Sequence, residues 1–168
     1  MLLIQARVSN YKSIDDSTTV DIDADVTTFV GQNESGKTAF LEALYKSNPA
    51  GSDAEFYFIE DYPRKRLSEY ERAHASSPGI VVTLTYRLED EEIKAINQDL
   101  EVDIISSLDF NVEFRYDNSK SCVFEISESS YIEYLKNQPV IRGVFSDNSE
   151  DRTTLQSLFT ALEGCDLN

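Results

Sequence analysis

The sequence predicts a mixed α/β fold in which a substantial part of the sheet is antiparallel. Short segments that alternate apolar and polar residues recur along the chain, and segments with helical periodicity lie between them. With 168 residues, 40% of them apolar, the chain can bury one ordinary core. We therefore expect a single lobe over residues 1–168, with an irregular connecting region at 49–79 and a strand and helix remainder at 80–168.

Three strands are expected before residue 31, in the segments LIQARVSNY, STTVDID and VTTFVG. A helix is expected to begin at the loop that follows and to run to about Lys46. Its buried face is expected to carry four apolar side chains: Phe40, Leu41, Leu44 and Tyr45.

The rest of the chain predicts further elements. In order, they are a charged and partly helical piece at RKRLSEYERA, a strand at GIVVTLTYRL, a helix at EDEEIKAINQDL, a β-hairpin formed by DFNVEFRY and SCVFEIS around DNSK, and helices at SSYIEYLKN and EDRTTLQSLFTALEG. Acidic residues at the start of the helix at EDEEIKAINQDL lie where the helix dipole favours them, so a solvated helix start is expected there rather than a metal site.

The segment GQNESGKT, residues 31–38, matches the phosphate-binding pattern G-x-x-x-x-G-K-[ST]. Gly31 and Gly36 let the backbone turn so that successive N–H groups face an anion, and the start of the next helix adds partial positive charge. Lys37 is expected to reach the β- and γ-phosphates of a nucleotide, and the Thr38 hydroxyl is the expected Mg²⁺ ligand. The fold prediction is therefore a P-loop NTPase lobe; a glycine-rich turn that caps a helix would not require Lys-Thr here.

The charge and the apolar content of the sequence indicate which kinds of partner it can bind. The net charge is −16 and the only dense basic run is Arg64–Arg66, so this lobe alone is not expected to bind nucleic acid tightly. No apolar run approaches the length of a transmembrane helix, and the start is too short for a signal peptide, so we expect no membrane contact and a cytoplasmic location. Cys122, Cys165 and the single His74 form no metal-binding pattern, and we expect idle thiols and a surface histidine.

Several of these segments resemble a known group of ATPases. GQNESGKT is similar to the G-x-N-x-S-G-K-[ST] loop of ABC-type ATPase heads of the SMC and RecF kind. ARVSNYKSIDDSTTVDID is similar to the start of those heads, where a short strand carries an N-[FY]-[KR]-S element. NESGKTAFLEAL and DYPRKRLSEYE resemble AAA-family ATPases related to the OLD (overcoming lysogenisation defect) nucleases. The resemblance is specific over residues 1–47 and looser to residue 97.

The resemblance implies a site for ATP with Mg²⁺ in a nucleotide-binding core at residues 1–48. Asn33 and Ser35 match positions typical of this loop, and Lys12 and Ser13 match the element that lies near the nucleotide in related heads. An exposed turn between strands remains the alternative for NYKSI. The expected nucleotide-binding residues are Gly31, Gln32, Asn33, Glu34, Ser35, Gly36, Lys37, Thr38, Ala39 and Lys12, with Thr38 as the metal ligand.

Other parts of the family's catalytic set are not found in the sequence. The signature of these heads has a Ser-Gly-Gly core, whereas none of the six glycines here are adjacent. FYFIED resembles a Walker B strand, but it follows Lys37 closely, lies in a proline- and glycine-rich region and has the order Glu-Asp. Glu60 or Asp61 is left as a possible residue of a loop that touches the metal or the attacking water. We expect an ATPase half-site without a complete catalytic set.

The resemblance implies the N-terminal lobe of a larger ATPase, in DNA repair or phage defence, that hydrolyses ATP poorly by itself. Its C-terminal lobe would be supplied in cis or in trans, the parent protein would be a homodimer, and DNA enters by family resemblance alone. A stand-alone module that uses nucleotide to pair with another chain is the alternative. A small phosphotransferase is a third reading, and the asparagine-containing loop argues against it.

Overall fold

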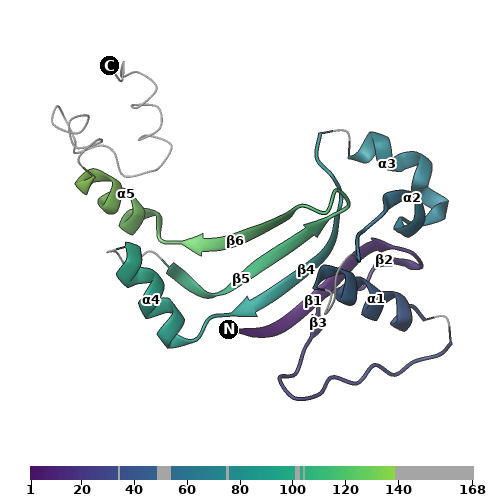
Figure 1. Ribbon diagram of the computed structural model, residues 1–168, viewed down its shortest axis with the longest axis horizontal. Helices are drawn as coiled ribbons and strands as arrows, with labels where there is room; N and C mark the ends of the chain where they lie inside the picture. The colour runs from purple at the N-terminus through teal and green to yellow at the C-terminus, as the bar shows by residue number, and fades with distance from the viewer. Residues whose placement is uncertain (34, 49–53, 75, 101–102, 104, 139–168) are drawn as a thin grey trace. The chain divides into compact units, whose positions relative to one another are not determined.

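The computed structural model describes residues 1–138 other than 34, 49–53, 75, 101–102 and 104, and Figure 1 shows their path. Contacts between residues divide the chain into two units. The first unit contains Met1–Leu88 and Asp109–Val123, and the second contains Glu89–Leu108 with the residues from Phe124 on. The helices of the described part all lack the length and apolar character that crossing a membrane requires. The helix expected at EDRTTLQSLFTALEG lies outside the described residues.

A sheet forms the centre of the fold, with the strand order β2-β1-β4-β5-β6 and with β3 also paired to β1. Its strands are β1 (Leu2–Tyr11), β2 (Ile14–Asp16), β3 (Val20–Asp21), β4 (Ile80–Arg87), β5 (Ile105–Arg115) and β6 (Lys120–Ile126). Each pairing whose register is described is antiparallel. The α/β class with a substantial antiparallel part is thereby confirmed, as are the strands predicted at LIQARVSNY, GIVVTLTYRL, DFNVEFRY and SCVFEIS. Strand β2 was not predicted.

Alternation along most of β1 and β4 buries the side chains on one face of the sheet, and Val81, beside a register shift in β4, is fully buried as well. Ala6 and Val8 of β1 lie opposite Leu84 and Val82 of β4, and all four side chains are buried. Arg7, between the two buried residues of β1, points the other way and pairs with Asp16 of β2. This period of two is the pattern that identified both strands in the sequence.

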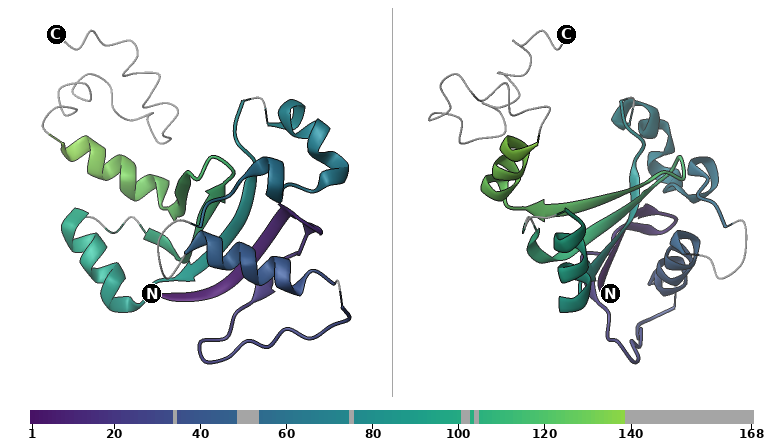
Figure 2. Two further views of the ribbon diagram at one scale, coloured as in Figure 1. Left: turned by 45° about the vertical axis from the view of Figure 1, so that its right-hand side comes forward. Right: turned by 60° about the vertical axis from the view of Figure 1, so that its left-hand side comes forward.

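The first unit carries three α-helices, α1 (Lys37–Ser47), α2 (Phe58–Asp61) and α3 (Leu67–Ala73), and a 3₁₀ turn at Arg64–Arg66. Helix α1 packs on β1 and β4 and covers one face of the sheet (Figure 2). The second unit carries α4 (Asp90–Leu100) and α5 (Glu128–Asn137). Ser127 begins α5 with a side chain that accepts a hydrogen bond from the Ser130 N–H, as an N-cap residue does.

The buried face of α1 differs from the prediction. Phe40 is buried and Leu44 packs against the core, but Leu41 and Tyr45 are 51% and 53% exposed. The remaining contact with the sheet is made by smaller side chains: Ala39, Ala43 and Ser47. Small residues allow the helix to approach the strands closely, so the stripe that faces the sheet is not the most apolar one. The prediction from large apolar residues was therefore right for Phe40 and Leu44 and wrong for Leu41 and Tyr45.

The strand predicted at VTTFVG is wrong for the described structure. Residues 26–30 form no strand, and Val26 and Val30 are 74% and 87% exposed. Phe29 alone turns inward, where its ring lies 5.1 Å from that of Phe40. Alternation supplies the side-chain pattern of a strand, but a strand also needs a neighbour for its N–H and C=O groups, and no described strand pairs with this segment. In STTVDID, only Val20–Asp21 pairs.

Aromatic rings attach α2 and α3 to the sheet. Phe58 stacks on Tyr70 at 4.8 Å, and Tyr62 lies edge-on to Tyr116 at 5.8 Å. His74, predicted as a surface residue, is half-buried with its ring 4.8 Å from that of Tyr70. Its role in the structure is therefore packing.

The corrected face of α1 predicts opposite responses to two substitutions. Ala43→Leu should lower the free energy of unfolding by about 1–3 kcal/mol, because added methylene groups would meet the sheet. Leu41→Ala, on the half-exposed side, should change it by no more than about 0.5 kcal/mol. Denaturant unfolding of both variants measures this, and a larger loss for Leu41→Ala would contradict the described face.

The pair between Arg7 and Asp16 predicts a pH dependence. Hydrogen bonds from the Arg7 side chain lower the pKa of Asp16 from 3.8 to about 2. The pair should therefore stabilise the fold above the unfolded-state pKa near 3.8, and this contribution should be lost as the pH falls through about 2. Unfolding of the wild type and of Asp16→Asn should differ at neutral pH and converge in acid. A difference that persists below that range would contradict the assignment.

Candidate functional site

The glycines of the GQNESGKT loop stand where an added side chain would make tight contacts. Gly36 has a φ of +88°, in the left-handed region that glycine favours. A Cβ at Gly36 would lie 3.2 Å from Ile14, and one at Gly31 would lie 3.1 Å from the Ser35 hydroxyl. The loop is thus folded tightly on itself and against the turn that follows β1. Glu34 lies outside the described residues.

Helix α1 begins directly after this loop, and its N-terminus has no side-chain cap. Gly36 occupies the N-cap position, and the first turn contains no acidic residue. The first N–H groups of a helix have no partner within the helix, and its dipole places partial positive charge there. This end of α1 is therefore suited to an anion.

Lys37 folds back over the loop. Its ammonium group donates to the Gly31 carbonyl at 2.8 Å, the Gln32 carbonyl at 2.6 Å and the Ser35 hydroxyl at 3.0 Å. All three acceptors are neutral, and the hydrogen bonds are exposed. Since bonds between two charged groups are stronger, a phosphate could replace these acceptors with a net gain.

Lys12 reaches the same place from the turn between β1 and β2. Asn10 and Lys12 both have a positive φ, of 53° and 50°, which non-glycine residues adopt only where the surroundings hold them. Here the Lys12 N–H donates to the Asp61 carbonyl, the Tyr116 hydroxyl donates to the Asn10 carbonyl, and Arg66 donates to the Asn10 side chain. Lys12 and Ser13 thus form an exposed turn between β1 and β2, as the alternative expected, and hydrogen bonds hold the backbone of this turn in place beside the loop.

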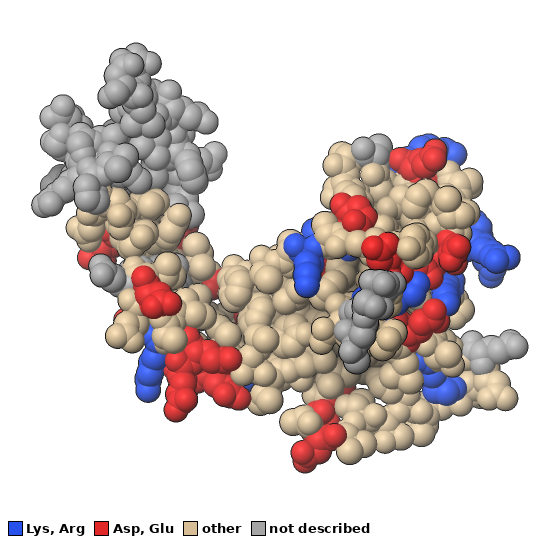
Figure 3. Space-filling model, viewed as in Figure 1, with Lys and Arg blue, Asp and Glu red and all other residues tan. Residues whose placement is uncertain are grey.

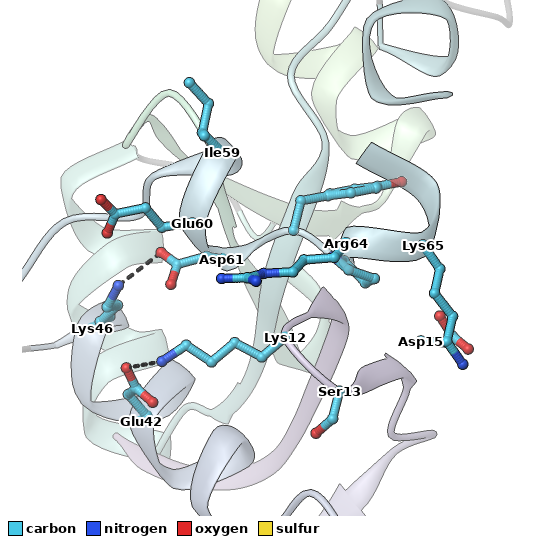
Figure 4. A pocket seen from close by; sticks show the side chains of 12 residues that line it. Lys12, Ser13, Asp15, Glu42, Lys46, Ile59, Glu60, Asp61, Arg64 and Lys65 are labelled. Carbon is cyan, nitrogen blue, oxygen red and sulfur yellow. Dashed lines mark hydrogen bonds and ion pairs between the residues drawn. The ribbon is translucent and has the colours of Figure 1, made fainter. Parts of the chain in front are cut away.

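Two hollows meet at Lys12. The first, called the loop hollow, has a volume of about 590 Å³ and is lined by Lys12, Ser13, Asn33, Ser35, Gly36, Lys37, Thr38, Ala39 and Glu42. The second, called the α2 hollow, has about 1000 Å³ and is lined by Lys12, Ser13, Asp15, Glu42, Lys46, Ile59, Glu60, Asp61, Tyr62, Pro63, Arg64 and Lys65 (Figure 4). Of the predicted residues, Gly31 and Gln32 belong to the loop without lining either hollow.

Two ion pairs connect α1 to its surroundings across these hollows (Figure 4). The Lys12 ammonium group lies 2.5 Å from Glu42, and the Lys46 ammonium group lies 2.7 Å from Asp61. Sequence reasoning did not single out Glu42 or Lys46. Their spacing offered a signal, because Thr38, Glu42 and Lys46 follow one another at intervals of four and so share a face of the helix.

Asp61 has a structural role. Its carboxylate is 2% exposed and accepts hydrogen bonds from Lys46 and from the Tyr57 N–H, which begins α2. The segment FYFIED contains this short helix rather than a strand, so it does not have the geometry of a Walker B element. Glu60 lines the α2 hollow beside Asp61.

Tyr11 is fully buried close to both ion pairs. Burial, and then the charges of Asp61 and Glu42, raise the pKa of its hydroxyl far above the ordinary value of 10.0. The hydroxyl group therefore stays protonated at every physiological pH. Its ring also lies near the ammonium groups of Lys12 and Lys46, at 5.5 and 5.8 Å from the centroid. Such contacts favour both cations at their present positions.

The donor set fits a nucleotide with Mg²⁺ better than it fits a metal ion alone. Thr38 in the first turn of α1 lines the loop hollow, so its hydroxyl could contribute one ligand. Among the described residues there is no cluster of three or more His, Cys, Asp or Glu side chains that could hold a metal. Mg²⁺ commonly keeps several waters and binds substrate phosphates through few protein ligands, which is consistent with this arrangement.

The basic run does not form an open patch. Arg66 lies 3.7 Å from Asp15 and also donates to Asn10. On the face shown in Figure 3, basic and acidic side chains intermingle around α1, α2 and α3. The first turn of α4 is acidic, with Asp90, Glu91 and Glu92. The described residues on this face therefore offer no continuous basic stripe for a phosphate backbone.

Comparisons with known proteins show a family and a likeness to solved structures. A family model described as an AAA ATPase domain matches residues 1–154. A search of curated proteins finds no match. A solved structure from work on ATP-driven dimerization and DNA-stimulated activation of SMC ATPases is similar over 99% of this chain and 94% of that chain, at 13% identity and a TM-score of 0.41.

The buried pair predicts a large loss of stability when one partner is removed. Lys46→Ala should lower the free energy of unfolding by about 3–5 kcal/mol, because it leaves the Asp61 carboxylate buried without a counter-charge. Lys65→Ala, a basic residue on the exposed rim of the same hollow, should cost little. Denaturant unfolding compares the two. Equal losses would show that Asp61 is hydrated or free to move.

Proposed function

The chain belongs to the AAA ATPase domain family, and from this premise we propose that it is the ATP- and Mg²⁺-binding N-terminal lobe of an SMC- or RecF-like ATPase. The observation that carries the proposal is the convergence of two cations from separate segments, Lys37 and Lys12, on one hollow at the uncapped start of α1. The start of α1, Lys37 and Lys12 thus all border the space that the Walker A loop surrounds, and Lys12 is paired there with Glu42.

Each site residue then has a proposed task. The backbone N–H groups from Gly31 to Ala39 bind phosphate oxygens, and Lys37 exchanges its loop carbonyls for the β- and γ-phosphates. Asn33 and Ser35 line the wall of the hollow and Lys12 closes its side. The Thr38 hydroxyl binds Mg²⁺, which neutralises phosphate charge when bound.

Hydrolysis by this chain alone is proposed to be slow. Activation of the attacking water requires a positioned base, and Asp61 is engaged with Lys46 and the start of α2. We propose that a C-terminal lobe, in cis or in trans, supplies the signature and Walker B residues, and that the parent protein acts as a cytoplasmic homodimer. A place in DNA repair or phage defence, and a closest relation to OLD-type ATPases, rest on the loop and the DYPRKRLSEYE segment. DNA would then contact other parts of the assembly.

One observation favours the alternative, in which a stand-alone module uses nucleotide to pair with another chain. Apolar side chains next to the site are exposed: Val26, Val30, Leu41 and Tyr45. Val26 and Val30 lie in the segment before the loop, and Leu41 and Tyr45 lie on α1 after it, so a partner bound to these side chains would contact the segments on both sides of the loop. Both functions share nucleotide binding and differ in whether the partner completes hydrolysis.

Calorimetric titration of ATP with Mg²⁺ into the chain tests the proposal. Lys37→Ala should weaken binding about tenfold or more, since a hydrogen bond to a charged group contributes about 1.5–3 kcal/mol. Lys120→Ala, an exposed lysine on β6 that lines neither hollow, is the matched control and should bind as the wild type does. Phosphate release in the same samples should stay near background.

Two outcomes would contradict this account. If the wild type bound no nucleotide, or if Lys37→Ala bound as tightly as Lys120→Ala, the loop would not be the binding site. Phosphate release that depends on Lys37 and is rapid in the isolated chain would show that an acid of this chain, such as Glu60, completes the site.

A further inference from the structure

The two cations at the loop hollow are held by different kinds of partner. Lys37 donates to two carbonyl groups and a hydroxyl group. Lys12 lies 2.5 Å from a full negative charge, the carboxylate of Glu42. To bind Lys37, a phosphate must replace two carbonyl groups and a hydroxyl group, which are all neutral. To bind Lys12, it must compete with the negatively charged carboxylate of Glu42.

The turn around Lys12 keeps its backbone where it is. The Lys12 N–H is bound to the Asp61 carbonyl, and the preceding Asn10 is held by Tyr116 and Arg66. Only the side chain of Lys12 is left to move. It stands at the wall that both hollows share, so it can face Glu42 or the interior of the loop hollow without any change of fold.

We propose that Glu42 sets the nucleotide affinity of this site by competing with the phosphate groups for Lys12. This inference rests on the proposed function, because it assigns a regulating residue to the same site. With the pair intact, Lys12 and Glu42 together add no net charge to the hollow, and Lys37 is the only unpaired cation among the described residues that line it. When a polyphosphate binds, Lys12 leaves Glu42 for a phosphate oxygen.

The exposure of the pair makes this exchange possible. The side chains of Lys12 and Glu42 are 40% and 36% exposed, so water screens their attraction and the pair is weak. Lys46 and Asp61, by contrast, are 16% and 3% exposed and form a permanent link. Glu42 also lies four residues before Lys46 on α1, and side chains at this spacing are neighbours on a helix. When Lys12 leaves Glu42, the Glu42 carboxylate therefore still has a cation nearby.

The competition predicts the behaviour of three variants in titration with ATP and Mg²⁺. Glu42→Gln keeps the shape of the side chain and should tighten binding about two- to fivefold, the range expected for an exposed ion pair. Glu42→Ala should act in the same direction. Asp109→Asn removes another exposed carboxylate that pairs with an arginine, on β5 and away from both hollows, and should leave the affinity unchanged.

A double-mutant cycle separates competition from simple repulsion of the nucleotide. Lys12→Ala should weaken binding more in the Glu42→Gln background than in the wild type, because only there is Lys12 free to meet the phosphates. Additive effects would mean that Glu42 acts by its charge alone and would overturn the proposal. If Glu42 had only a structural role, its substitution would change thermal stability, but the effects of the Glu42 and Lys12 substitutions on nucleotide affinity would not be coupled.

The outcomes also distinguish this inference from the proposed function. If the wild type binds ATP in a Lys37-dependent way and Glu42→Gln binds equally or more weakly, the competition is refuted and the binding site stands. If no variant binds ATP, both fail together. Tighter binding by Glu42→Gln with coupling to Lys12 supports both.

Discussion

One residue, Asp61, holds together the three segments from which the site is built. Its carboxylate binds Lys46 near the end of α1 and the Tyr57 N–H at the start of α2, while its carbonyl accepts the N–H of Lys12. The carboxylate is 2% exposed, so these bonds form away from bulk water, where an unmet charge is costly. Without this link, α1 could still pack on the sheet, but the turn that carries Lys12 would lose its hydrogen bond to α2 and would be held only by Tyr116 and Arg66 among the contacts described for it.

The site that results combines a rigid frame with two movable cations. The loop glycines, the turn at Asn10 and Lys12 and the close packing of α1 through Ala43 are all fixed by steric contact or by hydrogen bonds. The ammonium groups of Lys37 and Lys12 are exposed and held by partners that an anion can replace. Because the backbone of the loop is already in place and only the two lysine side chains must move, binding a phosphate costs little reorganisation free energy.

Much of this could be predicted from the sequence, because the relevant signals are local. Alternation identified β1 and β4, turn residues identified the hairpin of β5 and β6, and the loop pattern placed the glycines and Lys37 correctly against α1. The failures are non-local. The segment VTTFVG has the alternating side chains of a strand, but no described strand pairs with it. Helix α1 turns Ala43 toward the sheet, because a small residue lets the helix and the strands come close together. The pairing of Glu42 with Lys12 joins residues 30 positions apart, which periodicity cannot predict.

A crystal structure of the chain with Mg²⁺ and a non-hydrolysable ATP analogue tests the central claim most directly. The account predicts that the phosphates occupy the loop hollow, with Lys37 turned from the Gly31 and Gln32 carbonyls to a phosphate oxygen and the Thr38 hydroxyl beside the metal. It also predicts that Lys12 no longer contacts Glu42, while the bond between Lys46 and Asp61 is unchanged. A nucleotide bound elsewhere, or phosphates in the hollow with Lys37 still on its loop carbonyls, would contradict it.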